Sequence, residues 1–318
     1  MDRPGAVAQV RAAVAQFARD HQPDPAAWCV ALSGGADSLA LTVAAAALRP
    51  TTALIVDHGL QPDSATVAAT ARGQALSAGC VDAQVISVRV GTAGGPEAAA
   101  RAARYDALER TRDGRPVLLA HTLDDQAETV LLGLGRGSGP RSIAGMRPHD
   151  PPWCRPLLGV RRTVTVAACA EAGVTAWQDP HNSDPRYTRV RLRTEVLPLL
   201  EEVLAGGVAE ALARTATALR EDGDTLDELA DAALAGLGAQ PDVATLAALP
   251  GAVRRRVLRG WLLAHGACDL TDKHIRGVDA LVTAWRGQGA VAVPGTGRRE
   301  RLFAGRRGAT LRLHREPV

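Results

Sequence analysis

Short apolar runs alternate with longer amphipathic segments through the N-terminal part of the chain. The apolar runs predict strands, whereas the segments between them predict helices because their apolar residues recur at helical spacing. The strands are expected at residues 28–32, 51–57, 83–90 and 116–120. The helices are expected at residues 8–20, 39–44, 64–78, 97–111 and 124–134. Such alternation predicts an α/β fold, a parallel sheet with helices on both faces.

The alternation ends near Gly206–Gly207, and the pattern of the remaining chain is mainly helical. Helices are expected at residues 208–220, 225–237, 252–265 and 271–285, and short strands at residues 290–293 and 310–313. A chain of 318 residues is long enough for two domains. We therefore expect a catalytic domain with the sheet over residues 1–205 and a small, mainly helical domain over residues 206–318.

With 46% hydrophobic residues, the chain can bury a packed core. Its five cysteines have no CxxC or other metal-binding spacing, which argues against a zinc site or an iron–sulfur cluster. No apolar segment is long enough to span a bilayer, and the first residues lack the pattern of a signal peptide. We therefore expect a cytoplasmic protein that does not associate with membranes.

The segment Ser33–Ser38, with the sequence SGGADS, connects the first predicted strand to a helix. Its two glycines allow a tight turn and a close approach to a ligand, and the amides at a helix start attract phosphate. No lysine follows, so a nucleotide's charge would be held by amides, the two serine hydroxyls and a cation on Asp37. A bare SGG sequence is equally consistent with an ordinary capped turn. The full string resembles the PP-loop of the ATP pyrophosphatase superfamily, which cleaves ATP between its α and β phosphates.

Other polar residues follow the other predicted strands. Asp57 and His58 follow the second strand, and His121 follows the fourth. Ligands of parallel α/β sheets bind beyond the carboxyl ends of the strands, so these residues are expected to lie near the glycine-rich turn. The predicted nucleotide-binding residues are Ser33, Gly34, Gly35, Ala36, Asp37, Ser38, Asp57 and His58.

Three carboxylates, Asp124, Asp125 and Glu128, lie within about one turn of a predicted helix. One interpretation is an ordinary helix start, with Thr122 as N-cap and acids that complement the helix dipole. However, Asp124 and Glu128 repel each other at i,i+4, and three carboxylates exceed what the dipole needs. The group therefore predicts a bound cation, either a metal ion or an ammonium group.

Arginine makes up all but one of the 37 Lys and Arg residues, so single arginines are weak evidence of a nucleic acid partner. Arg101 is either the i,i+4 partner of Glu97 or a ligand of phosphate. Arg136 lies in a glycine-rich segment that either faces phosphates or forms a simple turn. The local clusters indicate either RNA binding or a solvated surface, and they are Arg254–Arg256, Arg259, Arg298–Arg299 and Arg306–Arg307.

Six motifs together resemble the tRNA(Ile)-lysidine synthase family and occur in the family's order. They are SGGADS (33–38), VDHGL (56–60), EAAARAARYDAL (97–108), AHTLDDQAETVLLGLGRGSG (120–139), RPLL (155–158) and DPHNSDPRYTRVRLRTEVLPLL (179–200). The resemblance implies an ATP-dependent ligase that joins L-lysine to the wobble cytidine of a tRNA(Ile) with a CAU anticodon. It also implies an adenylated cytidine intermediate, with AMP and pyrophosphate as the other products.

The resemblance further implies roles for residues at the matched positions. Asp125 and Glu128 would bind the substrate lysine, His121 would lie beside the adenylated base, and Arg101 would stabilise charge at the reacting phosphate. The implied catalytic residues are Asp37, Arg101, His121, Asp124 and Asp125, and the implied contacts to tRNA or phosphate are Arg136, Arg191 and Arg193. ATP is the implied co-substrate, and Mg²⁺ bound to Asp37 is the implied metal.

Two other functions stay open from the residues alone. A PP-loop enzyme could instead adenylate another tRNA base or a small amide-forming substrate. The chain could also be an RNA- or nucleotide-binding protein with a degenerate site, although the intact Ser33, Asp37, Asp125 and Glu128 argue against this. The sequence leaves the oligomeric state open, a homodimer included.

Overall fold

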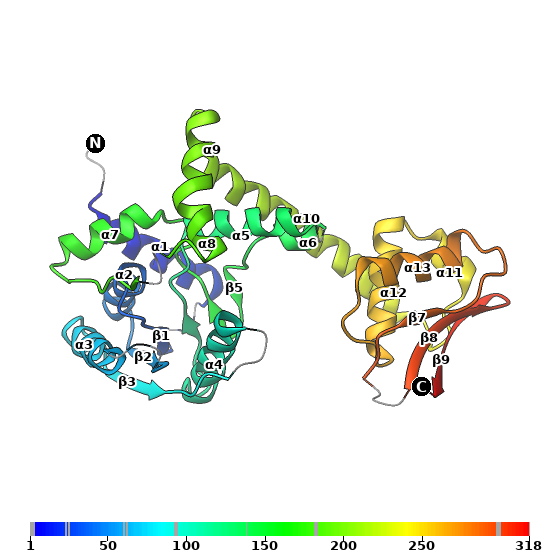
Figure 1. Ribbon diagram of the computed structural model, residues 1–318, viewed down its shortest axis with the longest axis horizontal. Helices are drawn as coiled ribbons and strands as arrows, with labels where there is room; N and C mark the ends of the chain where they lie inside the picture. The colour runs from blue at the N-terminus through cyan, green and yellow to red at the C-terminus, as the bar shows by residue number, and fades with distance from the viewer. Residues whose placement is uncertain are drawn as a thin grey trace. The chain divides into compact units, whose positions relative to one another are not determined.

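The computed structural model of the protein describes residues 4–22, 24, 26–59, 61, 63–91, 95–137, 139–180, 184–296 and 300–317 (Figure 1). Some positions of the predicted motifs and clusters lie outside the described residues, namely Leu60, Ser138, His181–Ser183, Arg298–Arg299 and the side chain of Glu97. Two compact units are present, residues 1–137 with 142–216 and residues 138–141 with 217–318. The two units divide within α10 (Val208–Ala235). The domain boundary predicted after residue 205 lies just before this helix, and it stays a prediction.

A six-stranded sheet forms the centre of the first unit. Its strands are β1 (Trp28–Ala31), β2 (Thr51–Asp57), β3 (Asp82–Ser87), β4 (Val117–Leu118), β5 (His149–Asp150) and β6 (Trp153–Cys154). They are ordered β3-β2-β1-β4-β6-β5, and every neighbouring pair is parallel except the antiparallel pair β5–β6 at one edge. The predicted parallel sheet is therefore confirmed, with an additional antiparallel edge.

Helices cover both faces of this sheet, as predicted. Trp28 and Val30 of β1 belong to a core shared with α1, α2, α3 and α7, whereas Cys29 and Ala31 pack on the other face with Leu108 of α4. This alternation follows from the two-residue period of a strand. The longer helices of this unit are α1 (Ala6–His21), α2 (Ala36–Ala46), α3 (Ser64–Ser77), α4 (Pro96–Thr111), α5 (Leu123–Arg136) and α7 (Arg162–Glu171).

Shorter helical segments complete the chain around this sheet. They are α6 (Pro140–Ile143), α8 (Thr188–Arg191), the π-helix η2 (Leu192–Val196) and α9 (Leu197–Val203). The last three follow one another without a break, and they carry Arg189, Arg191 and Arg193 of the last predicted motif. A π-helical turn within a helix is frequent at functional sites.

The strand order places two distant loops at the same edge of the sheet. Strands β1, β2 and β3 succeed one another in one direction, whereas β4 pairs with the opposite side of β1. The loops after β1 and β4 therefore leave the sheet on either side of this reversal, which is where ligands of open α/β sheets bind. The predicted glycine-rich turn and His121 follow these two strands.

The second unit combines helices with a small antiparallel sheet of order β7-β8-β9. Its further elements are α11 (Val243–Ala248), α12 (Gly251–Ala264), α13 (Asp272–Thr283), β7 (Val291–Val293), β8 (Glu300–Arg307) and β9 (Thr310–Pro317). Leu258 and Trp261 of α12 are buried in its core with Leu281 of α13 and Leu302 of β8. Strand β8 was not predicted, because its charged residues conceal the alternation of buried Leu302 and Ala304.

The helices predicted at 208–220 and 225–237 are wrong as two elements, because α10 is continuous from Val208 to Ala235 (Figure 1). Gly223 lies within it, and an interior glycine costs only about 1 kcal/mol relative to alanine. Within the described residues, no helix is both long and apolar enough to cross a membrane.

Candidate functional site

The segment Ser33–Ser38 forms the turn between β1 and α2. Gly34 has a φ of +84°, which favours glycine, and its carbonyl accepts a hydrogen bond of 2.9 Å from the Trp177 backbone N–H. The Ser38 hydroxyl donates to the Gly35 carbonyl at 2.9 Å and lies 3.1 Å from the Ser33 hydroxyl. No side chain caps α2, so the N–H groups of its first turn are available to an anion.

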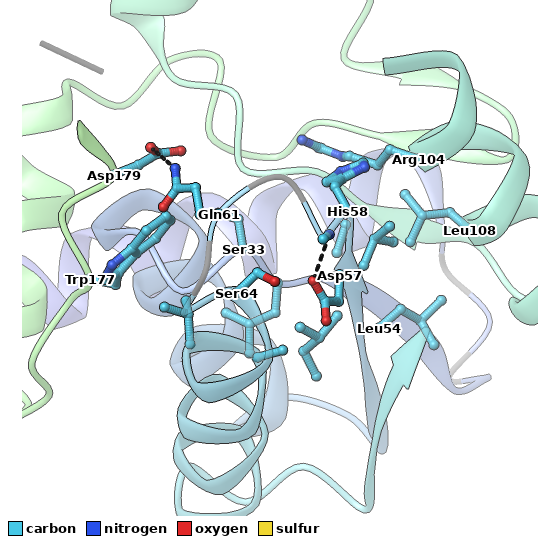
Figure 2. Close-up of a pocket in the computed structure, with 17 residues that line it drawn as sticks. Ser33, Leu54, Asp57, His58, Gln61, Ser64, Arg104, Leu108, Trp177 and Asp179 are labelled. Atoms are coloured by element: carbon cyan, nitrogen blue, oxygen red, sulfur yellow. Dashed lines mark hydrogen bonds between the residues drawn. The ribbon is translucent and has the colours of Figure 1, made fainter. Parts of the chain in front are cut away.

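A cavity of about 250 Å³ lies beside this turn, at the carboxyl ends of β1 and β2 (Figure 2). Ser33, Asp57 and His58, three of the predicted nucleotide-binding residues, line it. Figure 2 shows Trp177 on one side of the cavity and Arg104 with His58 on the other. A mostly apolar cavity with a few convergent polar groups is the usual form of a small-molecule site.

His58 and His121 each present an unsatisfied ring nitrogen. Nδ1 of both side chains is buried and has no hydrogen-bond partner in the part of the chain that the structure describes. Burial lowers the pKa of His121 to about 3, although the negative charge of Asp125 acts to raise it. Burial and the charge of Arg104 lower the pKa of His58. His121 is therefore neutral at pH 7, and both Nδ1 atoms are available to a ligand as donor or acceptor.

The predicted carboxylates are joined by one arginine, Arg162, the first residue of α7. Its Nη2 lies 2.6 Å from Asp125 Oδ1, its Nε 3.2 Å from Asp37 Oδ2 and its Nη1 3.5 Å from Glu128 Oε1. Its backbone N–H donates to Asp124 Oδ2 at 2.7 Å. The residues predicted to bind a cation therefore all contact Arg162, Asp124 through the backbone N–H and the other three through the guanidinium group. We call them, with their arginine partners, the acid–arginine cluster.

Three further arginines complete the acid–arginine cluster. Arg193 Nε lies 2.8 Å from Glu128 Oε1, and Arg189 Nη1 lies 3.5 Å from Glu128 Oε2. Arg161 Nη2 lies 3.3 Å from Asp124 Oδ1. Four guanidinium groups thus face the four carboxylates, and Arg161 also pairs with Glu210, whose Oε1 lies 3.0 Å from its Nη1. Glu128 is fully buried, yet its Oε2 accepts no hydrogen bond from any described residue.

The charges of the cluster shift one another's pKa values. Burial raises the pKa of Asp37, and it outweighs the lowering by the Thr165 hydroxyl and by Arg162. Burial also opposes the ionisation of Asp125, but the Arg162 charge and hydrogen bonds from Thr122 hold its pKa below the usual value. The pKa of Arg162 is raised because its carboxylate neighbours, Asp125 above all, outweigh its burial. Asp125 and Arg162 are therefore a charged pair.

The oxygens of Asp37 do not by themselves form a metal site. The Thr165 hydroxyl donates to Oδ1, and Arg162 Nε donates to Oδ2. Among the described residues no three His, Cys, Asp or Glu side chains are grouped to hold a metal ion. Mg²⁺ in nucleotide sites is commonly bound by one or two carboxylates together with phosphates and water. The residues present fit such a partial site only, with Asp37 as a single protein ligand.

Comparison with known proteins matches both units. A PP-loop domain model matches residues 7–200, and a TilS substrate binding domain model matches residues 242–311. The tRNA(Ile)-lysidine synthases of Mycobacterium tuberculosis (strain ATCC 25618 / H37Rv) and Mycobacterium leprae are 72% and 68% identical to the chain over 324 residues, and each alignment covers 100% of both sequences. The chain belongs to the tRNA(Ile)-lysidine synthase family.

Membership of the tRNA(Ile)-lysidine synthase family confirms the resemblance inferred from the six motifs, and with it a ligase with an ATP-using PP-loop domain. A solved structure with the same fold is the U34-tRNA thiolase NcsA from Methanococcus maripaludis, at a TM-score of 0.56. It is 16% identical, and the match covers 68% of this chain and 80% of that one. At this identity the likeness shows the fold alone.

The structure separates the predicted site residues of this family member into two groups. Asp37, Asp124, Asp125, Glu128 and Arg193 come together in the acid–arginine cluster, and Ser33, Asp57 and His58 line the cavity. The other three arginines lie outside both groups. Arg101 is exposed and stacks on Tyr105 at 4.8 Å, Arg191 pairs with Glu195 at 2.8 Å, and Arg136 is exposed at the end of α5. The roles predicted for these three stay predictions.

Several residues of the site were missed by the sequence analysis. Arg162 and Thr165 belong to α7, a helix that was not predicted, although Gly173 just after it is an ordinary helix-ending signal. Arg189 lies in the same motif as Arg191 and Arg193 but was not among the predicted residues. Arg104 and Trp177 line the cavity, and no sequence pattern singles them out from their neighbours.

We expect His121→Gln to make the protein less sensitive to acid. The unfolded imidazole titrates near 6.5 whereas burial holds the pKa of His121 to about 3 in the fold, so below about pH 6.5 only the unfolded state gains the proton. The wild type should lose about 2 kcal/mol of stability through this residue between about pH 8 and about pH 5. Urea unfolding of both proteins at the two pH values measures the difference.

The exposed His314 provides the control, and His314→Gln should keep the acid sensitivity of the wild type. An identical pH dependence for wild type and His121→Gln would show that His121 takes up its proton in the folded state.

Proposed function

We propose that the protein uses ATP to join L-lysine to the wobble cytidine of a tRNA(Ile) with a CAU anticodon. The base carbonyl oxygen attacks the α-phosphorus of ATP, and pyrophosphate leaves. The ε-amine of lysine then attacks the ring carbon, the C–O bond to the adenylate breaks, and AMP departs with the electron pair. The amine proton is lost to a base or to solvent, so the products are lysidine, AMP and pyrophosphate.

The observation that carries this proposal is the double role of Asp37. It belongs to the PP-loop turn, and it is also joined through Arg162 to Asp125 and Glu128. A nucleotide on the turn and an amine at the acids would therefore meet at adjacent side chains. The names of the family relatives support the same reaction. A magnesium ion would be held mainly by phosphate oxygens, with Asp37 as its one proposed protein ligand.

Glu128 supports the proposed ammonium site. Its side chain is fully buried, and its Oε2 accepts no hydrogen bond from the described residues, although Arg189 Nη1 lies 3.5 Å away. An unsatisfied buried carboxylate oxygen is costly, and a primary ammonium carries three donors that could satisfy it. Because arginines already neutralise the cluster, lysine would bind by replacing a guanidinium contact. The sequence had suggested an uncompensated acidic patch instead.

Asp37→Ala tests the whole proposal. We expect the variant to fold and to incorporate no measurable labelled lysine into tRNA(Ile), because the residue between the nucleotide turn and the lysine site is lost. The measurement is lysine incorporation by wild type and variant with ATP, together with the unfolding temperature of each. Incorporation at the wild-type rate would exclude a catalytic or metal-binding role for Asp37, and a wild type that never incorporates lysine would refute the proposed function.

Glu128→Gln tests the lysine site separately from nucleotide use. We expect the KM for lysine to rise about 10-fold or more, since a charged hydrogen bond contributes about 1.5–3 kcal/mol. Release of pyrophosphate from ATP with tRNA(Ile) should persist. Glu195→Gln is the matched control, because Glu195 is exposed and pairs only with Arg191 among the described residues. An unchanged KM in Glu128→Gln would place lysine elsewhere.

The second unit offers a basic cavity for the tRNA. It has a volume of about 640 Å³, and Arg306, Arg307 and Arg312 line it without any Asp or Glu among its described lining residues. The side chains of Arg307 and Arg312 form no hydrogen bond or ion pair within the described part of the chain. Arginines without counter-charges are suited to the phosphates of RNA.

The predicted cluster Arg254–Arg256 is engaged differently. Arg254 Nε lies 2.6 Å from Asp279 Oδ1, and Arg256 Nε lies 2.7 Å from Asp227 Oδ1. These ion pairs join α12 to its neighbouring helices. The geometry therefore favours the cavity arginines as contacts to tRNA.

We expect the double variant Arg307→Ala/Arg312→Ala to weaken tRNA binding and to lower the slope of log Kd against log salt by about 1–2, because each lost phosphate contact removes about one unit. Filter binding at several salt concentrations provides both values. Arg276→Ala is the control, since Arg276 is exposed and pairs with Asp272 in the same unit. Wild-type affinity and slope in the double variant would remove this cavity from the tRNA site.

A further inference from the structure

The cavity beside the PP-loop turn contains a half-buried arginine that forms no ion pair with any described residue. Arg104, on α4, lines the cavity, and it forms no hydrogen bond or ion pair with any residue that the structure describes. It is the only arginine or lysine among the described lining residues. Two carboxylates also line the cavity, and each accepts a hydrogen bond from a neutral donor, Asp57 from the Gly59 N–H at 3.0 Å and Asp179 from Gln61 at 3.1 Å.

Partial burial of this guanidinium group is unfavourable without a ligand. The pKa of Arg104 is lowered by desolvation, with a smaller effect from the charge of Arg101. Arginine nevertheless stays protonated in proteins, so the charge persists in the cavity. A charge removed in part from water is normally paired, so an arginine on a cavity wall without an ion pair among the described residues favours an anionic ligand.

The neighbours of Arg104 fit an anion as well. Its charge acts on both His58 and His121, whose pKa values it lowers. Two imidazoles with unsatisfied Nδ1 atoms and one guanidinium therefore surround the same region, and Figure 2 shows Arg104 next to His58. A phosphate can accept hydrogen bonds from a guanidinium group and from an imidazole N–H.

Arg101, three residues earlier on the same helix, is oriented differently. Its guanidinium stacks on the Tyr105 ring at 4.8 Å, and its Nη2 donates to the Tyr105 hydroxyl at 3.2 Å. Arg104 and Leu108, one turn apart, both line the cavity, and Leu108 is fully buried. The rotation of α4 thus presents Arg104 to the cavity and leaves Arg101 exposed.

We propose that Arg104 is the residue that binds the α-phosphate of the adenine nucleotide in this cavity. The proposal rests on the proposed function, and it replaces Arg101 by Arg104 at the reacting phosphate. The turn amides would hold the pyrophosphate part, which leaves the phosphate nearest the nucleoside for the cavity wall. Two N–H groups of the guanidinium donate to the non-bridging α-oxygens. In the first step they stabilise the negative charge on the α-phosphate oxygens while the base oxygen bonds to phosphorus and pyrophosphate leaves. In the second step they stabilise the negative charge of the departing AMP.

The test compares AMP and adenosine as probes, because they differ in the α-phosphate alone. Calorimetric titration of the full chain would use wild type, Arg104→Gln and Arg104→Lys. We expect Arg104→Gln to weaken AMP binding about 10- to 100-fold while adenosine affinity stays within about 2-fold of wild type. Arg104→Lys, which keeps the charge, should recover part of the AMP affinity. The unfolding temperature of each variant reports on the fold.

Two other arginines of α4 complete the design. Arg110→Gln is the control, because Arg110 is exposed and pairs with Asp106 at 2.7 Å, and it should bind both probes as wild type does. Arg101→Gln tests the alternative that Arg101 binds the phosphate. Loss of AMP affinity in Arg101→Gln with none in Arg104→Gln would overturn the proposal in favour of the sequence prediction.

Equal losses of AMP and adenosine in a folded Arg104→Gln protein would also overturn it, since the side chain would then only shape the cavity. These binding results do not depend on lysine or tRNA. Failure of lysine incorporation by the wild type is therefore distinguishable from failure of the role assigned to Arg104.

Discussion

The contacts of Arg162 with Asp37, Asp125 and Glu128 hold the site together. They join α2, α5 and α7, three helices that begin at the same edge of the sheet. Removing one partner from a buried ion pair costs about 3–5 kcal/mol, because the remaining charge is left uncompensated. Arg162 keeps 22% of its side-chain surface exposed, so each of its contacts contributes less than that. Together they fix the PP-loop turn relative to the start of α5.

The neutrality of the acid–arginine cluster has a consequence for the proposed second step. An amine attacks only after losing a proton, and nearby positive charges lower the pKa of an ammonium group. A lysine bound at Glu128 would lie close to Arg189 and Arg193 as well as to the carboxylate. The carboxylate would capture the ammonium, while the arginines favour its deprotonated form. An uncompensated acidic patch would bind lysine but would hold it protonated.

The sequence predicted the local parts of this site well. The turn Ser33–Ser38 and the acids of α5 are contiguous motifs, and the alternation of strands and helices put them at one sheet edge. The arginine partners of these acids could not be predicted from the sequence. Arg162 is 125 positions away from Asp37 in the chain, and it belongs to a helix that the hydrophobic periodicity did not predict. A charged group is visible in one segment, but its partner is fixed only by packing.

The choice between Arg101 and Arg104 shows the same limit at a finer scale. Both belong to one motif and are three residues apart, so spacing places them on adjoining parts of one helix surface. The rotation of α4 decides between them, and tertiary contacts set it. Leu108 packs against the sheet, and the Tyr105 ring meets Trp153 edge-on at 4.7 Å. Neither contact can be derived from the spacing within the motif.

The cavity and the acid–arginine cluster are coupled through His121. Burial and Arg104 keep this imidazole neutral, whereas the charge of Asp125 favours its protonation. In the proposed reaction a nucleotide phosphate would neutralise Arg104, which removes one of the charges that oppose a proton on His121. Because such linkage is reciprocal, any rise in the pKa of His121 on nucleotide binding would be matched by stronger nucleotide binding once His121 is protonated. The protonation of His121 is therefore linked to the charge of Arg104 on the cavity wall.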